Sequence, residues 1–324
     1  MDYLYFILGL VLLLLGANYL VDSSVAIAKQ AKISNFVIGL TIVGFGTSAP
    51  ELFVSIQSAL TGHGDIAMGN VVGSNIANLL LILGVSATIC PFVIKKQIHK
   101  IDIPFGIAAA ILLTLLVNDT MMPGISKNEL SRIDGIFLLI IFFCYMGYVI
   151  YTKAKNPQEA LEEMKEDSKS KLEGKAPLLL WVIAAASLAA LLFGGNMFLE
   201  SAKSLARSWG MSEAVISITI VAIGTSLPEL ITAVIAAMKK NPELALGNVL
   251  GSNVFNILMI LGLSATICPI TSQGVSVVDY AVMIVASIGT FIVTYTFKKK
   301  MFDRAEGIIF LCGYVAYMAY LLMR

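Results

Sequence analysis

The feature that most constrains the fold of this 324-residue chain is an internal repeat. Residues 41–91 and 219–269 align without a gap at an offset of 178, and 28 of the 51 aligned positions are identical. The register continues upstream, where Gly16, Asn18 and Asp22 align with Gly194, Asn196 and Glu200. A self-match at a fixed offset indicates two copies of one structural unit. The fold must therefore place two related halves in one molecule.

Each copy contains five apolar runs of roughly the 20 residues that cross a bilayer as a helix. The ten expected spans are 3–21, 36–60, 66–89, 101–118, 133–151, 178–199, 213–238, 243–267, 277–297 and 305–323. Composition agrees, since 58% of the residues are hydrophobic and only 13% are charged. Such a chain cannot cover a soluble core with polar surface, and its net charge of +1 offers no basic surface for nucleic acid. The predicted class is an all-α membrane protein embedded in lipid.

An odd number of crossings per copy turns the second copy upside down in the membrane. The sequence therefore predicts ten transmembrane helices in two inverted five-helix repeats, 1–151 and 177–324, joined by a hydrophilic linker at 152–176. The repeat signal is strongest over about 39–91 and 217–269. Transporters built from inverted repeats place their site near the bilayer centre, where the two copies meet.

Lysine and arginine predict the orientation of the spans. With the amino terminus outside, 17 of the 22 basic residues fall in cytoplasmic loops and the other 5 fall outside. Because basic residues accumulate in cytoplasmic loops, we expect both termini outside and the linker 152–176 in the cytoplasm. The first run has no basic segment before it, so we expect a true span and not a cleaved signal peptide. The predicted location is the plasma (cell) membrane, as a multi-pass protein.

The first polar motif inside the apolar runs is Gly-Thr-Ser-x-Pro-Glu, which ends at Glu51 in one copy and at Glu229 in the other. Proline has no N–H and clashes with the preceding turn, so it kinks or opens a helix. We expect the opened turns to free backbone carbonyls near Gly44 and Ala222. An ionisable residue in mid-span is costly and usually marks function. Two mirrored glutamates therefore predict a shared cation site.

The second motif is Gly-Ser-Asn-x-x-Asn, in which the serine and the last asparagine are four positions apart and share one helix face. We expect this face to contact an ion, with interhelical hydrogen bonding as the alternative. The residues on it are Ser74, Asn78, Ser252 and Asn256. For the middle asparagines, Asn75 and Asn253, we favour interhelical hydrogen bonding.

The donors in both motifs are nearly all oxygen atoms: carboxylates, hydroxyls, amide carbonyls and backbone carbonyls. No His, Cys or Met occupies these positions. Oxygen ligands favour hard cations such as Ca²⁺ and Na⁺ over soft transition metals. Two glutamates balance one Ca²⁺, and the same two charges can instead neutralise sodium ions at neighbouring hydroxyl and amide groups. A site neutralised by either set of ions couples their two flows.

The paired motifs resemble the two alpha-repeats of the calcium/cation antiporter superfamily, and specifically those of prokaryotic sodium/calcium exchangers. The resemblance implies a secondary antiporter that exchanges Na⁺ for Ca²⁺ by alternating access, is not an enzyme and carries no prosthetic group. For Ca²⁺ it implies the side chains of Glu51, Glu229, Thr47 and Thr225 with the carbonyls of Gly44 and Ala222. For Na⁺ it implies Ser48, Ser74, Ser226 and Ser252.

The resemblance also assigns a moving part. The first and sixth spans are poor in site residues and are similar to the family's gating pair, which slides against a fixed core. Four glycines suit either close sliding contact or ordinary packing: Gly9, Gly16, Gly194 and Gly195. Asp22 and Glu200 lie near the ends of these spans, so we expect interfacial anchors, with attraction of cations as the alternative.

Two other functions are alternatives to Na⁺/Ca²⁺ exchange. A proton-coupled antiporter of Ca²⁺ or another divalent cation is the alternative, although the first motif is not the GNxxE form of that branch. Potassium-dependent members have an aspartate where this chain has Asn256. An intramembrane metal-dependent hydrolase is disfavoured, because the chain has no HExxH motif and its two histidines, His63 and His99, fall in loops. The oligomeric state is left open.

Overall fold

A computed structural model of the protein describes residues 1–96, 98–118, 129–154, 170–211, 224–272, 274–293, 295–296 and 301–323. Within these ranges the regular structure is helical except for four strands of two residues each. Seven helices are long and apolar enough to cross a membrane, or eight when the bent pair over residues 35–60 counts as one span. Two shorter apolar helices add to these. The prediction of an all-α membrane protein is confirmed.

The helical elements follow the same order in both halves of the chain. The first half contains α1 (Asp2–Ala31), α2 (Asn35–Ile38), η1 (Gly39–Val43), α3 (Gly44–Thr47), α4 (Ala49–Leu60), α5 (Gly64–Ile76), η2 (Ala77–Ile82), α6 (Leu83–Ile89), η3 (Ile98–Asp102), α7 (Ile103–Val117) and α8 (Arg132–Ala154), where η marks a π-helical turn. The second contains α10 (Pro177–Ser208), α13 (Leu227–Met238), α14 (Pro242–Val254), η6 (Phe255–Ile260), α15 (Leu261–Ile267), α16 (Val277–Ile292) and α17 (Arg304–Met323). The run α4–α5–η2–α6 recurs as α13–α14–η6–α15 at the sequence offset of 178. The repeat in the sequence is therefore a repeat in the structure.

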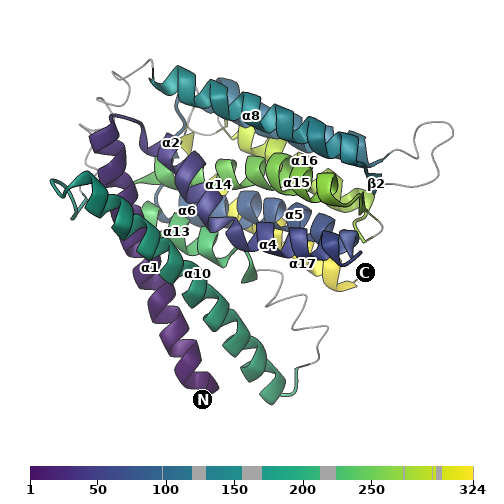
Figure 1. Ribbon diagram of the computed structural model, residues 1–324, viewed down its shortest axis with the longest axis horizontal. Helices are drawn as coiled ribbons and strands as arrows, with labels where there is room; N and C mark the ends of the chain where they lie inside the picture. The colour runs from purple at the N-terminus through teal and green to yellow at the C-terminus, as the bar shows by residue number, and fades with distance from the viewer. Residues whose placement is uncertain are drawn as a thin grey trace.

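Helices α1 and α10 lie side by side and extend away from the other helices in Figure 1. Their backbones touch at glycines. A Cβ atom added to Gly16 would lie 2.5 Å from the amide nitrogen of Leu191, and one on Gly9 would lie 2.6 Å from that of Phe198. Gly194 faces Leu13 in the same way, whereas Gly195 meets only side chains of α1 and α13. Three of the four noted glycines thus hold α1 and α10 against each other.

Both of these helices are longer than the sequence predicts. The expected spans 3–21 and 178–199 become helices that end at Ala31 and Ser208. In α1 the extension is buried and partly polar, so hydropathy alone does not reveal it. Asp22, expected as an interfacial anchor, is only 3% exposed. That expectation is wrong, because the carboxylate lies inside the protein against a lysine from another helix.

The lysine is Lys239, which follows the end of α13. Its Nζ lies 2.7 Å from Asp22 Oδ1 and donates to the backbone carbonyl of Asn18 at 2.8 Å. The mirrored acidic residue, Glu200, instead pairs with Lys203 on its own helix and is largely exposed. The ion pair therefore ties α1 to the helix that carries Glu229 at one end of the molecule.

The described end of the linker packs along the same stretch of α1. Ser170 donates to the carbonyl of Asp22 at 2.7 Å, and Gln30 donates to the carbonyl of Lys175 at 2.7 Å. Glu173 forms an ion pair with Lys29. Residues 155–169 of the expected linker lie outside the described part of the chain. The described end of the linker is therefore packed against α1.

The two halves interlock through short strands and glycine contacts. Strand β1 (Phe92–Val93) pairs antiparallel with β4 (Met301–Phe302), and β2 (Glu129–Leu130) pairs with β3 (Ile270–Thr271). Beside these ribbons, α6 packs on α17 and α15 packs on α8. A Cβ atom on Gly135 of α8 would lie 2.7 Å from the carbonyl oxygen of Gly262 of α15. The last helix of each half therefore packs on the other half.

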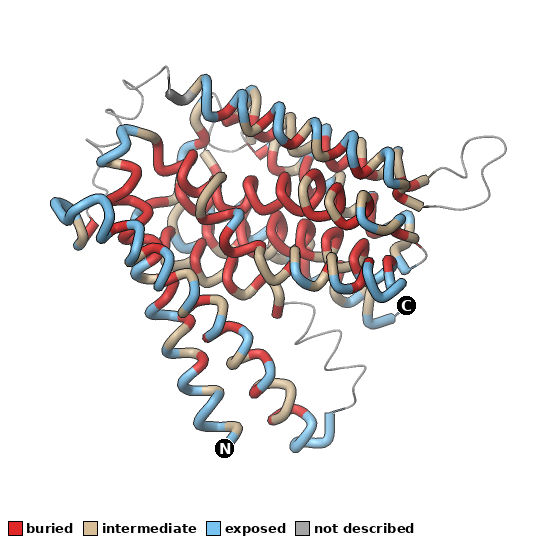
Figure 2. The backbone as a smooth tube through the Cα atoms, viewed as in Figure 1, coloured by how far each residue is buried: buried red, intermediate tan, exposed pale blue. Residues whose placement is uncertain are grey.

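Burial identifies the helices at the centre of the bundle. In the span Pro242–Ile267, 94% of the most apolar window is buried, and in Gly64–Ile89 the value is 72%. The corresponding share is only 28–33% in the other long helices, whose outer faces are apolar and suited to lipid. Figure 2 shows the buried residues concentrated in the middle of the bundle. The helices that carry the second polar motif are therefore the most enclosed.

Candidate cation site

The first motif breaks its helix where the sequence predicts. The segments Asn35–Thr47 and Ala49–Leu60 are bent by 46° at Ser48, two residues before Pro50. Ser226 has nearly the same backbone angles as Ser48, and α13 begins directly after it. Both breaks follow from a proline that cannot donate a helical hydrogen bond and crowds the preceding turn.

The carbonyl of Gly44 is not freed by this break. It accepts the backbone N–H of Ser48 at 3.1 Å, so the expectation of an open turn at this carbonyl is wrong. The hydroxyls of Thr47 and Ser252 also approach it, at 3.4 and 3.3 Å. A carbonyl oxygen has two lone pairs, and the hydroxyls supply the additional donors. Ala222, the mirrored residue, lies outside the described residues.

The two motif glutamates come together from opposite halves of the chain. Ser48, one turn before Glu51, donates to Oε1 of Glu229 at 3.0 Å. Ser74 donates to Oε1 of Glu51 at 3.4 Å. Each glutamate is only 1% exposed. Both carboxylates therefore face the protein interior and do not point to lipid or headgroups. That of Glu229 lies against the helix break at Ser48.

Each glutamate is held at its backbone by an asparagine of the second motif region. Asn70 Nδ2 donates to the carbonyl of Glu51 at 3.3 Å, and Asn248 Nδ2 donates to that of Glu229 at 3.4 Å. Their oxygens accept from the threonines of the opposite half: Thr225 reaches Asn70 at 3.5 Å and Thr47 reaches Asn248 at 3.1 Å. These asparagines were not among the predicted site residues. Their identity at mirrored positions was the signal that could have added them.

Several oxygen atoms in this cluster are buried and have no hydrogen-bond partner within the described residues. They are Oε2 of Glu51, Oε2 of Glu229, Oδ1 of Asn78, Oδ1 of Asn256 and Oγ of Ser226. A buried charge costs several kcal/mol unless it is paired. Two half-satisfied carboxylates surrounded by amide and hydroxyl oxygens therefore fit a bound hard cation, which these oxygens would coordinate.

The chemistry of the cluster also argues against a transition-metal centre. Among the described side chains, no three of His, Cys, Asp or Glu come together. Neutral hydroxyls, amides and backbone carbonyls must then complete any coordination shell around the two glutamates. Such a shell suits Ca²⁺ or Na⁺ and offers no soft ligand.

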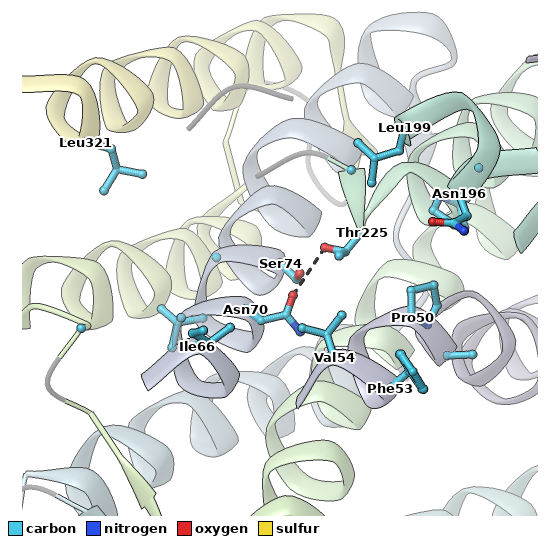
Figure 3. A pocket seen from close by; sticks show the side chains of 18 of the residues that line it. Pro50, Phe53, Val54, Ile66, Asn70, Ser74, Asn196, Leu199, Thr225 and Leu321 are labelled. Atoms are coloured by element: carbon cyan, nitrogen blue, oxygen red, sulfur yellow. Dashed lines mark hydrogen bonds between the residues drawn. The ribbon is translucent and has the colours of Figure 1, made fainter. Parts of the chain in front are cut away.

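A cavity of about 840 Å³ reaches the cluster from one side. Asn70, Ser74 and Thr225 line it, and Figure 3 shows the threonine hydroxyl directed at the asparagine oxygen. The cavity wall also includes Glu200 and Lys203 of α10, at the end of that helix away from the linker. Within the described part of the chain, the cavity therefore lies between α5 and α10 and reaches the polar residues of the cluster.

The mirrored side of the cluster is closed. Thr47, Asn248 and Ser252, the counterparts of the cavity-lining polar residues, are all 0% exposed. They are covered because α14 packs backbone to backbone on the first broken helix. A Cβ atom on Gly251 would overlap the carbonyl of Leu40. Among the described residues, this side of the cluster is therefore sealed by the first broken helix.

Comparison with known proteins agrees with this description. The chain is 34% identical over 319 residues to the putative antiporter CaxA of Alkalimonas amylolytica, covering 97% of this chain and 96% of that protein. It is 31% identical over 350 residues to the sodium/calcium exchanger MaX1 of Methanosarcina acetivorans, covering 99% and 98%. A solved structure of the sodium-calcium exchanger NCX_Mj, soaked with Na⁺ and Ca²⁺, is similar with a TM-score of 0.82 and 30% identity over 98% of this chain and 97% of that one.

A bundle of membrane-crossing helices around a buried oxygen cluster is the arrangement expected of a membrane transport protein. Residues 1–151 and 179–323 match the family described as sodium/calcium exchanger protein. The chain belongs to this family. Its predicted membership of the calcium/cation antiporters is confirmed, and it is a cation antiporter by family.

Proposed function

We propose that this protein exchanges Na⁺ for Ca²⁺ by alternating access at a single site near the membrane midplane. The observation that carries the proposal is the pair of buried glutamates, one from each half, each with one carboxylate oxygen that lacks a described partner. Their charge of minus two matches one Ca²⁺. Without a cation, two carboxylates in a low-dielectric interior are costly, which opposes crossing of the empty site.

The proposed ligands follow the two motifs. Ca²⁺ is placed at Glu51, Glu229, Thr47 and Thr225 with the carbonyl of Ala222 and with that of Gly44, where the ion would replace the two long hydroxyl contacts. Na⁺ is placed at Ser48, Ser74, Ser226, Ser252, Asn78 and Asn256. The neutral serines and asparagines suit monovalent ions, while the glutamates provide the charge that a divalent ion requires. Because the charge of the same two carboxylates is neutralised by either ion set, the two sets compete, and competition at one site produces exchange.

The proposed architecture has ten transmembrane helices in two inverted repeats, 1–151 and 177–324, with the linker 152–176 in the cytoplasm and both termini outside. In this topology the 840 Å³ cavity opens outward, since the α10 residues in its wall lie on the outer side. The plasma membrane is the proposed location. Labelling of single cysteines with an impermeant reagent, placed in the linker and at the carboxyl terminus, tests the orientation.

The proposed moving part is the pair α1 and α10. Their glycine contact joins them, and they pack along the broken helices that carry the glutamates. Sliding of this pair would close the cavity beside α5 and open its mirror beside α14. The buried contact of Gly251 with Leu40 would then separate, which supplies the inward passage.

Transport in proteoliposomes tests the proposal. Radiolabelled Ca²⁺ uptake is measured with a Na⁺, K⁺ or H⁺ gradient imposed in turn and with pH clamped in the first two cases. We expect uptake driven by the Na⁺ gradient alone. Uptake that requires only a pH gradient would contradict sodium coupling and support proton-coupled exchange. Absence of Ca²⁺ flux under every gradient would reject the calcium assignment.

A further inference from the structure

Four asparagines, two from each half, are joined by hydrogen bonds across the centre of the protein: Asn75 and Asn253 close a ring with each other, and Asn78 and Asn256 each bond to one member of that ring. Asn78 Nδ2 donates to Oδ1 of Asn253, and Asn256 Nδ2 donates to Oδ1 of Asn75, both at 2.9 Å. Asn75 and Asn253 also donate to each other's backbone carbonyls, both at 3.4 Å. The four side chains are between 1% and 7% exposed. The interhelical hydrogen bonding predicted for the middle asparagines is therefore confirmed.

The ring fixes which end of each outer amide is free. An asparagine side chain has a donating NH₂ end and an accepting oxygen end, and only the oxygen can ligate a cation. The NH₂ groups of Asn78 and Asn256 are occupied by the ring. Their Oδ1 atoms are buried and accept no hydrogen bond from any described residue. Each outer asparagine thus keeps its nitrogen end on the ring and presents a buried acceptor oxygen that no described group satisfies.

The middle asparagines cannot rotate without breaking the ring. Both ends of Asn75 are engaged, the oxygen by Asn256 and the nitrogen by the carbonyl of Asn253. A flipped Asn75 would place an NH₂ group against the NH₂ of Asn256 and an oxygen against a carbonyl oxygen. Two favourable contacts would become two repulsive ones, and the same holds for Asn253 by symmetry. The orientation of each middle amide is therefore fixed, because its nitrogen end and its oxygen end each have a partner that the flipped amide would lose.

We propose that Asn75 and Asn253 are positioning residues for the transported ion, each of which turns the amide oxygen of the other half's asparagine toward the cation. The inference rests on the proposed cation site but adds two residues that do not belong to its ligand set. The arrangement is crossed, because Asn75 orients Asn256 and Asn253 orients Asn78. One turn before Asn78, Ser74 donates to Glu51, so the oriented oxygen lies next to the carboxylate cluster.

The ring also explains why an amide suits position 256. An ionised aspartate there would place an acceptor against Oδ1 of Asn75, which has no proton to offer. Asn75 could donate to that aspartate only by flipping, and a flip would set its own oxygen against the carbonyl of Asn253. The neutral Asn256 avoids this conflict and still presents one oxygen toward the site. The amide at position 256 therefore suits Asn75, because it donates to the Asn75 oxygen and still offers its own oxygen to a cation.

Double-mutant cycles on the crossed pairs test this inference. The variants are Asn75→Ala, Asn256→Ala and Asn78→Ala, singly and in the pairs that contain Asn75→Ala. The readouts are the apparent KM for Na⁺ and the maximal rate of Na⁺-driven release of radiolabelled Ca²⁺ from proteoliposomes. We expect Asn75→Ala to raise the KM for Na⁺ about tenfold, as is typical when a group that orients a metal ligand is removed, with a smaller change in maximal rate.

The crossed pattern separates positioning from general packing. In the Asn256→Ala background, Asn75→Ala should raise the KM for Na⁺ by less than about twofold more, because the amide that Asn75 orients is absent. In the Asn78→Ala background it should raise the KM by its full factor. The mirrored cycle with Asn253→Ala should show the opposite dependence, and it stands in if Asn75→Ala does not fold. Ser86→Ala, a buried hydroxyl outside the ring, is the matched control and should leave the KM unchanged.

Equal effects of Asn75→Ala in both backgrounds, or a single-variant KM within twofold of wild type, would overturn the positioning role. That result would leave the proposed function intact, provided that Asn256→Ala still raises the KM. If Asn256→Ala and Asn78→Ala both leave the KM unchanged, the asparagine ligands fail and the positioning role falls with them.

Discussion

The ion pair between Asp22 and Lys239 gives a prediction whose size follows from its geometry. The side chain of Asp22 is 5% exposed and that of Lys239 is 22% exposed, with 2.7 Å between Nζ and Oδ1. We expect Lys239→Met to destabilise the protein strongly, because it leaves a carboxylate buried without its counter-ion. The other carboxylate oxygen already has no hydrogen-bond partner in the described structure, so nothing nearby replaces the lysine.

The magnitude can be estimated from the distance and the burial. At the 2.7 Å separation, two unit charges interact by about 6 kcal/mol at an effective dielectric constant of roughly 20. Removing one partner of a buried pair typically costs about 3–5 kcal/mol. Because the lysine end is partly exposed, we expect the lower end, about 3 kcal/mol. The ion pair at the equivalent position of the second repeat, between Glu200 and Lys203, is more exposed at its carboxylate and should contribute less than about 1 kcal/mol to the free energy of unfolding.

Thermal unfolding of the purified protein in detergent is the assay. At roughly 2–4 °C per kcal/mol, Lys239→Met should lower the apparent melting temperature by about 6 °C or more, and Lys203→Met, the matched control, by under about 3 °C. The double variant with Asp22→Asn should regain most of the loss, since it removes the unpaired charge. Equal shifts for the two lysine variants, or no recovery in the double variant, would refute the reasoning.

Three further predictions concern the site and its packing. Glu51→Gln or Glu229→Gln should nearly abolish Ca²⁺ transport while the protein still folds, and wild-type Ca²⁺ flux in either variant would remove that glutamate from the site. Asn256→Asp should change the dependence of transport on Na⁺ and K⁺, as measured by flux at varied ion concentrations; identical profiles would count against a ligand role. Gly251→Ala should destabilise by about 1–3 kcal/mol, because the added Cβ would overlap the carbonyl of Leu40; a melting temperature equal to that of the wild type would contradict this contact.

Much of the site could be predicted because its determinants are local. Proline chemistry places the helix break near Ser48 whatever surrounds it. The spacing of Ser74 and Asn78 puts both on one face by helical geometry alone. The mirrored motifs then pair the two halves, which is why the glutamates were expected to meet.

The rest depended on partners that are remote in sequence. The burial of Asp22 requires Lys239, which lies more than two hundred positions later, and hydropathy gives no sign of that contact. The role of Asn70 and Asn248 depends on threonines from opposite halves. Each of these is set by tertiary packing, which no local pattern encodes.

The exchange of terminal helices between the halves has a consequence for biosynthesis. When a ribosome has completed α8, every helix of the first half exists, but the face of α8 around Gly135 has no occupant until Gly262 is made. Until then the first half is only partly assembled, and lipid contacts the face of α8 that α15 later covers. Neither half can complete its packing before the other is made, because α8 is covered by α15 and α6 is covered by α17.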